Sequence, residues 1–195
     1  VVVAQKEKVS FLHEAFKNLP DAKDLKVLNG AIYTGSGHGA AELGHLRPGL
    51  DALHPEQTLE SLAAGWGIAA QARRRAAERL AADPNDAPAG DLVRRSGELS
   101  AIQARHVAEA AAAGNELALA VVAAAARALG WGVAQMITLL APQAVVIGGG
   151  VSLMGESLFL EPVRAAVDHY VFPPFRGTFQ ILPAQLGEEM VIVLI

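Results

Sequence analysis

Cysteine is absent from this sequence, which excludes disulfide bonds and thiolate metal sites and is compatible with a reducing compartment. Clusters of positive charge are scarce as well. The net charge is −4, and the largest run of cations is the triplet Arg73–Arg75. That triplet lies in an alanine-rich helical pattern, so a solvated helix face explains it better than a nucleic-acid-binding surface does.

Long uninterrupted apolar segments are also missing. Glycine, arginine or glutamine interrupts each apolar run before it approaches the roughly 20 residues that span a membrane. The beginning of the chain shows no signal peptide. The sequence therefore predicts a cytoplasmic globular protein that has no membrane partner and no nucleic-acid partner.

The chain has 195 residues, of which 52% are hydrophobic. This is enough to bury a sizeable core in one domain or two lobes. The sequence starts at Val1 without a methionine and stops within the apolar run Val191–Ile195. Because such a run needs covering, we expect a longer natural chain, with internal segments absent from this sequence as an open alternative.

Strands and long helices alternate along the sequence, which predicts the α/β class. Strands are expected over Val1–Ala4, Val27–Tyr33 (a hairpin with Asn29-Gly30 as its turn), Ala144–Ile147 and Thr178–Leu182. Helices are expected over Thr58–Ala82, Glu116–Leu140 and Leu186–Ile195, and Asn115 is the expected N-cap of the second of these. Another helix is expected to begin with a capping box at Ser100–Gln103 and to end at Ala113. A further helix should begin near Leu153–Glu156 and end at Tyr170. Ala87–Gly90 is expected to be a polar loop.

The segment Gly35–His45 has the sequence GSGHGAAELGH and combines four glycines with polar side chains. Glycine allows the backbone to turn sharply or to approach a ligand closely. Glu42 and His45 are three positions apart, so their side chains point the same way within one helical turn. This pair suits a polyhydroxylated ligand or half of a metal site, and an exposed pair on a glycine-rich turn is the alternative.

Three segments together resemble the ROK family of repressors, open reading frames and sugar kinases. Residues 29–45, which begin NGAIY, are similar to the family's NG-x-x-Y-x-G…G-A-x-G-E-x-G-H run. Residues 59–65, LESLAAG, resemble its LE-x-x-A-S-G, and residues 141–152, APQAVVIGGGVS, resemble its D-P-x-x-I-V-I-G-G-G-V-S. The three motifs follow one another in the family's order over most of the chain.

The resemblance implies an actin-like (ribonuclease-H-like) two-lobe sugar-kinase fold, represented here mainly by the large C-terminal lobe. In this interpretation residues 27–185 form that lobe and contain the sugar motif and the glycine turn. Residues 1–26 are a fragment of uncertain placement, with the N-terminal lobe as one option. Residues 186–195 begin a C-terminal helix.

The activity implied by the resemblance is ATP-dependent phosphorylation of a hexose or N-acetylhexosamine, as in glucokinases, with ATP and Mg²⁺. Glu42, His45 and Glu60 would bind sugar hydroxyls, because carboxylates accept hydrogen bonds and a neutral imidazole both donates and accepts. Gly148, Gly149 and Gly150 would contact the nucleotide. The alternative for these glycines is a tight strand–helix connection.

Two features of kinases in this family are not found here. Neither the N-D-x-N motif that carries the catalytic Asp nor the D-x-G-G-T phosphate loop occurs, so the catalytic base is unknown. Ala41 also replaces the family glycine that precedes the Glu, which adds a methyl group near the expected sugar site.

Many relatives hold a structural zinc through three cysteines and the histidine that matches His45. Asp51, Leu53 and Thr58 occupy the cysteine positions here, and leucine cannot ligate zinc. We therefore expect that zinc is absent. A substitute site formed by His45, Asp51 and His54 is the alternative.

Two other functions remain open. One is a sugar-responsive transcriptional repressor of the same family, which would need an upstream DNA-binding module. The other is a sugar-binding relative without catalysis. Sugar and ATP are the expected partners, together with a second copy of the chain in a homodimer. The sequence does not identify the sugar or the hydroxyl that is phosphorylated.

Overall fold

The computed structural model describes residues 2–4, 24–28, 31–33, 42–184 and 193–194. The predicted turn at Asn29-Gly30 and most of the segment Gly35–His45 lie outside these residues. The chain divides into two compact units. The first comprises residues 1–43, 131–153 and 167–195, and the second comprises residues 44–130 and 154–166.

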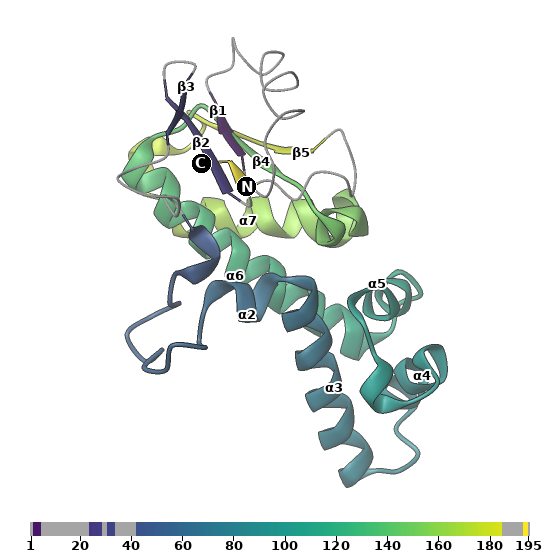
Figure 1. Cartoon of the computed structure of the whole chain (residues 1–195). Coiled ribbons are helices and arrows are strands. Elements are labelled where there is room, and N and C mark those ends of the chain that lie inside the picture. Colours follow the sequence, from purple (N-terminus) through teal and green to yellow (C-terminus); the bar gives the residue numbers. More distant parts are fainter. Residues whose placement is uncertain (1, 5–23, 29–30, 34–41, 185–192, 195) are drawn as a thin grey trace. The chain divides into compact units, whose positions relative to one another are not determined.

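The first unit contains a sheet with the strand order β3-β2-β1-β4-β5 (Figure 1), and β6 pairs with β2 beside this path. The strands are β1 (Val2–Ala4), β2 (Asp24–Leu28), β3 (Ala31–Tyr33), β4 (Ala144–Ile147), β5 (Gln180–Pro183) and β6 (Val193–Leu194). The pairs β1/β2, β4/β5 and β2/β6 are parallel, whereas β2/β3 and β1/β4 are antiparallel. The predicted strands at Val1–Ala4, Ala144–Ile147 and Thr178–Leu182 are therefore confirmed within one or two residues.

The predicted hairpin is confirmed by the register of β2 and β3. Leu28 pairs with Ala31, which leaves a two-residue connection between the strands. The prediction for the C-terminal segment is wrong at Val193–Leu194. These residues extend the sheet as β6, parallel to β2, where a helix was expected. A short apolar run with β-branched residues is compatible with a helix or with a strand, and the pairing with β2 makes this segment a strand.

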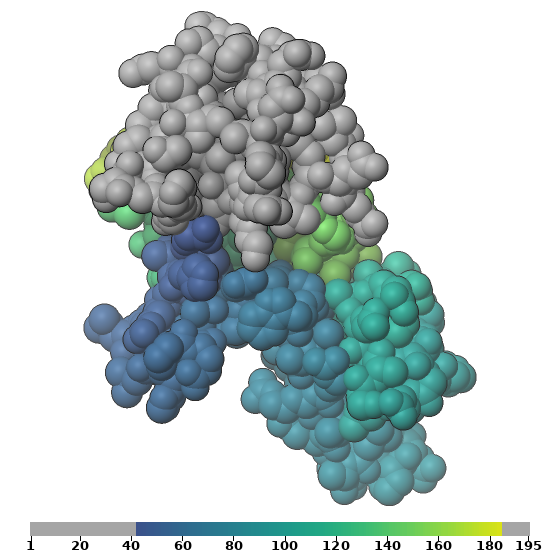
Figure 2. Space-filling view, viewed as in Figure 1, coloured from purple at the N-terminus to yellow at the C-terminus, as the bar shows by residue number. Residues whose placement is uncertain are grey.

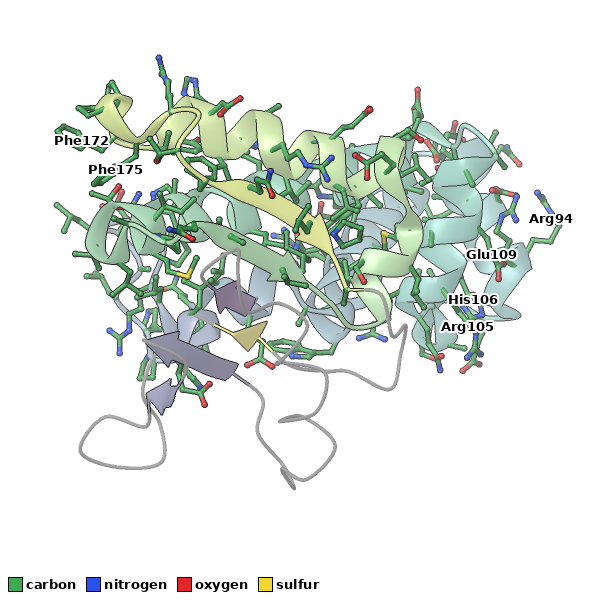
Figure 3. All side chains as sticks on the ribbon, turned by 90° about the horizontal axis from the view of Figure 1, so that it is seen from above. Arg94, Arg105, His106, Glu109, Phe172 and Phe175 are labelled. Atoms are coloured by element: carbon green, nitrogen blue, oxygen red, sulfur yellow. The ribbon has the colours of Figure 1, made fainter. Side chains whose placement is uncertain are left out.

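Strand β4 is the most apolar strand among those whose burial is described, with Ala144, Val145 and Ile147 buried. Figure 3 shows it beside β5, with which it pairs from Ala144 to Ile147. Burial of this continuous apolar run agrees with the sequence-based expectation. Just after the C-terminal end of β5, the Ala184 N–H donates a hydrogen bond to the Ile147 carbonyl of β4 (2.9 Å).

The segment between β4 and β5 includes helix α7 (Glu161–Tyr170). The sequence predicted one helix from Leu153–Glu156 to Tyr170, but the structure has a 3-10 turn at Gly150–Met154 and a π-helical turn at Glu156–Leu160 before α7. Gly155 separates these turns with a φ of 89°, a conformation that glycine adopts at low cost. After α7, Phe172 and Phe175 pack edge to face, with ring centroids 5.7 Å apart (Figure 3).

The second unit is helical (Figure 2 shows α3 against the pair α4 and α5). Its helices are α2 (Leu59–Ala63), α3 (Gly65–Ala82), α4 (Ala87–Ser96), α5 (Ala104–Ala112) and the first parts of α6 (Glu116–Leu140) and of α7. The predicted helix Thr58–Ala82 is thus two helices. Ala64 has the extended angles φ −74° and ψ 159° and separates them.

The predicted loop Ala87–Gly90 is wrong, because these residues begin α4. The Asp86 carboxylate accepts a hydrogen bond from the Ala89 N–H (2.8 Å), and Pro88 occupies the first turn, where its missing N–H costs nothing. The bond from Ala89 is the main reason that the pKa of Asp86 lies below its ordinary value, and the Arg79 guanidinium lowers this pKa further.

Helices α5 and α6 begin with caps. The capping box predicted at Ser100–Gln103 instead starts at Gln103, whose backbone N–H donates to His106 Nδ1 (3.2 Å), and a 3-10 turn occupies Leu99–Ala101. In Figure 3, Arg105 lies beside the buried His106, with its Nε 3.2 Å from Nε2 of that ring. For α6 the prediction is confirmed: the Asn115 side-chain oxygen accepts from the Ala118 N–H (3.1 Å).

Asn115 also fastens α4 to the start of α6. Its amide donates to the Pro88 carbonyl (2.9 Å) and to an Asp91 oxygen (3.0 Å). The same carboxylate pairs with Arg95 (2.9 Å) and with Arg94. The hydrogen bond from Arg95, followed by the one from Asn115, lowers the pKa of Asp91.

The helical unit has a core that consists largely of alanine. The alanines with no exposed surface in this unit are Ala72, Ala76, Ala89, Ala110, Ala118, Ala125 and Ala126. Larger side chains such as Ile68, Leu92 and Val121 are buried among the same helices. Because alanine projects little from the backbone, helices lined by it pack closely.

Among the residues that the structure describes, one helix is long and apolar enough to cross a membrane by length and composition alone. This helix is α6, with a mean hydropathy of 1.8 over its most apolar window. Its apolar run is interrupted, as expected from the sequence, by Arg127, Gly130, Gly132 and Gln135. Within the structure, 56% of that window is buried, as in the core helix of a globular protein.

Candidate functional site

Glu60 lies in the first turn of α2, and its backbone position is fixed by the cap of that helix. Thr58 Oγ1 accepts a hydrogen bond from the Ser61 N–H (3.3 Å), and the Ser61 hydroxyl donates to the Thr58 carbonyl (2.7 Å). Leu59, which precedes Glu60, is buried and anchors the helix in the core. The Glu60 side chain is exposed, so its carboxylate is accessible to a ligand.

The segment around His45 runs directly against the start of α2. The Leu59 N–H donates to the Leu46 carbonyl in a short hydrogen bond of 2.7 Å. Gly44 lies so close to α2 that a Cβ atom placed on it would be 3.4 Å from Glu60 Cβ and 3.9 Å from Glu60 Oε2. The fourteen residues between His45 and Glu60 therefore form a loop whose two ends are in contact.

Trp66 also contacts the Glu60 carboxylate. Its indole Nε1–H donates to Glu60 Oε1 at 3.3 Å, and the side chain is 55% exposed. Analysis of the sequence did not single out this residue. The signal that was available is the run GWG at residues 65–67, which directly follows the LE motif and breaks an otherwise alanine-rich helix.

Gly67 explains how α2 and α3 approach so closely at this point. A Cβ atom on Gly67 would lie 2.4 Å from the Ser61 carbonyl oxygen and 3.0 Å from the Glu60 carbonyl oxygen. The Gln71 amide also donates to the Leu62 carbonyl (2.9 Å), which ties the second turn of α3 to α2. These contacts hold the Trp66 and Glu60 backbones in one arrangement.

The structure places two of the three predicted sugar-binding residues on segments that touch each other. His45 is exposed at the end of the 3-10 turn Leu43–His45, next to Gly44, and Gly44 contacts Glu60. Glu42 is half-buried and belongs to the first unit. The binding of a sugar by Glu42, His45 and Glu60 stays a prediction.

The loop from Leu46 to Gln57 is the segment in which the family resemblance implies a structural zinc and in which this sequence predicts none. Leu53 is 76% exposed. Asp51 and His54 are exposed too, and the backbone carbonyl of Asp51 and the N–H of His54 are used within the loop itself. Across the part of the chain that the structure describes, no group of three histidine or acidic side chains is arranged to hold a metal ion. The absence of zinc from the protein stays a prediction.

The turn Gly148–Gly150 follows the buried strand β4. Gly149 has a φ of 84°, and its carbonyl accepts hydrogen bonds from the Ser152 N–H (3.0 Å) and hydroxyl (2.7 Å). No described atom lies within 4 Å of the position of a Cβ on Gly149. Glycine at this position is therefore required by the backbone angle, whereas close packing of a neighbour does not require it.

A turn of this kind has the geometry of a phosphate- or nucleotide-contacting loop. It lies at the carboxyl end of a strand, where ligands of open α/β sheets bind. The 3-10 turn Gly150–Met154 begins there, and backbone without side chains allows a close approach. Contact of Gly148, Gly149 and Gly150 with a nucleotide stays a prediction.

Comparison with known proteins identifies relatives of the chain. It is 30% identical over 164 residues to a glucokinase from Thermotoga maritima, an alignment that covers 84% of this chain and 50% of the relative. A glucokinase from Halalkalibacterium halodurans is 30% identical over 172 residues, with 86% and 49% covered. The chain thus spans about half the length of the curated relatives that it matches.

Solved structures agree with this relationship. The ROK family glucokinase from Streptomyces griseus, crystallised with glucose and AMPPNP, superposes with a TM-score of 0.69 at 28% identity, over 84% of this chain and 55% of that one. A ROK family transcriptional regulator, a homologue of the E. coli MLC protein, superposes with a TM-score of 0.63 at 20% identity, over 82% and 40% of the two chains, and supports the fold alone.

These neighbours confirm the α/β, actin-like sugar-kinase fold that the sequence predicted. The sequence profile of the ROK family matches residues 26–193, which is most of the chain and includes all three motifs. The chain therefore belongs to the ROK family.

Proposed function

We propose that the protein containing this chain is an ATP-dependent kinase for a hexose or an N-acetylhexosamine. The observation that carries the proposal is the contact between Gly44, next to His45, and the exposed Glu60 on α2. It joins two motifs that are separate in sequence into one polar surface. The glucokinases from Thermotoga maritima and Halalkalibacterium halodurans support the same activity.

Each residue of the candidate site has a role that its chemistry allows. Glu60 accepts a hydrogen bond from a sugar hydroxyl, and His45 donates or accepts another, with Glu42 completing the set. Together they hold the sugar in one orientation, which is a large part of catalysis in phosphoryl transfer. The chain shows no catalytic base, so deprotonation of the reacting hydroxyl is assigned to no residue here.

The Gly148–Gly150 turn is proposed to hold the ATP. Its backbone angle at Gly149 and the free space beside that residue, among the described atoms, suit a ligand that lies against bare backbone. Mg²⁺ bound with the ATP would offset negative charge on the phosphates. A cytoplasmic location and a homodimer are part of the proposal, and light scattering of the purified protein tests the latter.

The test uses protein expressed from the complete gene. ADP release is measured with glucose, mannose, N-acetylglucosamine and N-acetylmannosamine. At least one sugar should be phosphorylated, and Glu60→Gln should raise its KM about tenfold or more, because a hydrogen bond to a charged group contributes about 1.5–3 kcal/mol. Glu78→Gln is the matched control, since Glu78 is an exposed carboxylate on α3 away from the site. Its KM should not change.

Two outcomes contradict the proposal in different ways. If no sugar binds in calorimetry, the sugar site itself is wrong. If a sugar binds but ATP is not consumed, a non-catalytic sugar-binding protein or a sugar-responsive repressor is the better interpretation. The fold shared with the ROK family transcriptional regulator is compatible with the repressor alternative.

A further inference from the structure

Trp66 has an unusual environment for the largest apolar side chain of the second unit. More than half of its surface is exposed, although aromatic side chains are mostly buried in folded proteins. Its N–H group makes a hydrogen bond to Glu60 Oε1 at 3.3 Å. An exposed indole whose one polar atom contacts the carboxylate of a candidate site is better suited to a ligand than to the core.

The backbone that carries Trp66 has little freedom to move. Its neighbour Gly67 lies against the Ser61 carbonyl with no room for a Cβ atom. On the other side, Gly65 is close to α5, since a Cβ on it would be 3.6 Å from the Ala104 methyl group. The indole therefore extends from a rigid connection between α2 and α3, and a ligand would meet it already in place.

The two oxygens of Glu60 have different neighbours as a result. Oε1 accepts the hydrogen bond from the indole, whereas Oε2 lies on the side of Gly44, 3.9 Å from the position of a Cβ on that residue. Gly44 has no side chain, so nothing from that residue covers Oε2. With Oε1 engaged by the indole, Oε2 is the oxygen that lies near the segment containing His45.

We infer that Trp66 is a substrate-positioning residue: it holds Oε1 of Glu60, so that Oε2 is presented to a single sugar hydroxyl beside Gly44 and His45. This inference rests on the proposed sugar-kinase function. It also changes the expected role of Glu60, which would present one oriented oxygen to the sugar and hold the indole with the other. The face of the indole is left for the apolar C–H face of a sugar ring.

The test is a double-mutant cycle in the full-length protein with Trp66→Phe and Glu60→Ala. Phenylalanine keeps an aromatic ring and removes the N–H donor. The probe is whichever of the four panel sugars has the highest kcat/KM in the wild-type protein. Trp66→Phe should raise the KM for that sugar about tenfold and leave the KM for ATP unchanged. In the Glu60→Ala background the same substitution should have little further effect, because the acceptor of the N–H group has been removed.

Trp131→Phe is the matched control, since Trp131 is the other tryptophan of this sequence and lies on α6, in the first unit. Its sugar KM should stay at the wild-type value. The urea midpoint of Trp66→Phe should also equal that of the wild-type protein, because the side chain is mostly exposed. This separates a positioning role from a structural one.

The outcomes distinguish the inference from the function on which it rests. If the wild-type protein binds no panel sugar, the proposed function fails and the inference fails with it. If the wild-type protein phosphorylates a sugar and Trp66→Phe has the same KM, the inference alone is wrong. If Trp66→Phe weakens binding equally with and without Glu60→Ala, Trp66 acts on the sugar independently of Glu60 and the positioning role is refuted.

Discussion

Gly67→Ala is the substitution that probes the candidate site most directly through its scaffold. The added methyl carbon would lie 2.4 Å from the Ser61 carbonyl oxygen and 2.6 Å from the carbonyl carbon. Side-chain carbons essentially never come within 3.0 Å of such atoms, so the helices must separate by at least 0.6 Å, the difference between 3.0 and 2.4 Å. Both contacts are with backbone, and no flexible side chain can move aside.

The expected loss of stability combines two opposing effects. Overpacking a close contact costs about 1–3 kcal/mol, and the rigidity of the backbone places this contact at the upper end. Alanine favours the helical state over glycine by about 0.8–1.0 kcal/mol, which offsets part of the cost. We expect a net loss of about 1–2 kcal/mol, seen as a fall of about 0.5–1 M in the urea midpoint.

The same shift should affect the function. The Glu60 carbonyl would be 3.0 Å from the new methyl group, so a displacement of α2 changes the contacts of Glu60 with Gly44 and Trp66. The KM for the sugar should therefore rise together with the loss of stability. ATP affinity should change much less, because the residues proposed to contact the nucleotide lie in the other unit.

Gly90→Ala provides the control for this experiment. Gly90 lies inside α4, and no described atom is within 4 Å of a Cβ placed on it. This substitution should stabilise the protein by up to about 1 kcal/mol through helix propensity alone. Equal urea midpoints for Gly67→Ala and the wild-type protein would refute the close-contact argument, and an unchanged sugar KM in a destabilised Gly67→Ala would refute its link to Glu60.

Three further predictions concern other parts of the molecule. Gly149→Val should weaken ATP binding at least about tenfold, or 1.4 kcal/mol, with sugar affinity nearly unchanged in calorimetry. The control is Gly177→Val, which places a side chain at a similar φ of 76° elsewhere in the chain and should leave ATP affinity intact. Equal ATP affinities in the two variants would remove the nucleotide assignment. Asp91→Asn should lower the urea midpoint at about pH 6 but much less at about pH 3. The hydrogen bond from Arg95 lowers the pKa of Asp91 in the folded protein, so the ionised carboxylate stabilises the fold at pH values above its unfolded pKa. This contribution is lost as the pH falls through the folded pKa. Elemental analysis of the purified protein should find no stoichiometric zinc; one zinc ion per chain would contradict this and direct attention to the loop after His45.

The sequence predicted best those elements whose signals are local. Asn115 has a side chain that caps a helix, and it caps α6. The continuous apolar run Ala144–Ile147 forms the buried strand β4. The Asp86-x-Pro88 sequence at the start of α4 was equally local and was misread as a loop, although both residues favour the first turn of a helix.

Features decided by tertiary contacts were not predictable from local signals. The break at Ala64 occurs within an alanine-rich run, and it accompanies the close packing of Gly67 on the Ser61 backbone. The contact between Gly44 and Glu60 was expected only through the family motifs, since fifteen residues separate the two ends of the loop. Trp66 was missed for the same reason, because its partner Glu60 is on another helix.

The alanine-rich core of the helical unit has a consequence for how this chain tolerates mutation during evolution. In a core of large side chains, the damaging changes are truncations that leave cavities, at about 2–5 kcal/mol each. At positions such as Ala72, Ala76 and Ala118, with no exposed surface, only glycine is smaller, and nearly every other missense change inserts atoms between helices that already touch. Substitutions at these sites are therefore limited to side chains that are not larger than alanine. Relatives that have a larger side chain at one of these positions should have a smaller side chain on the facing helix.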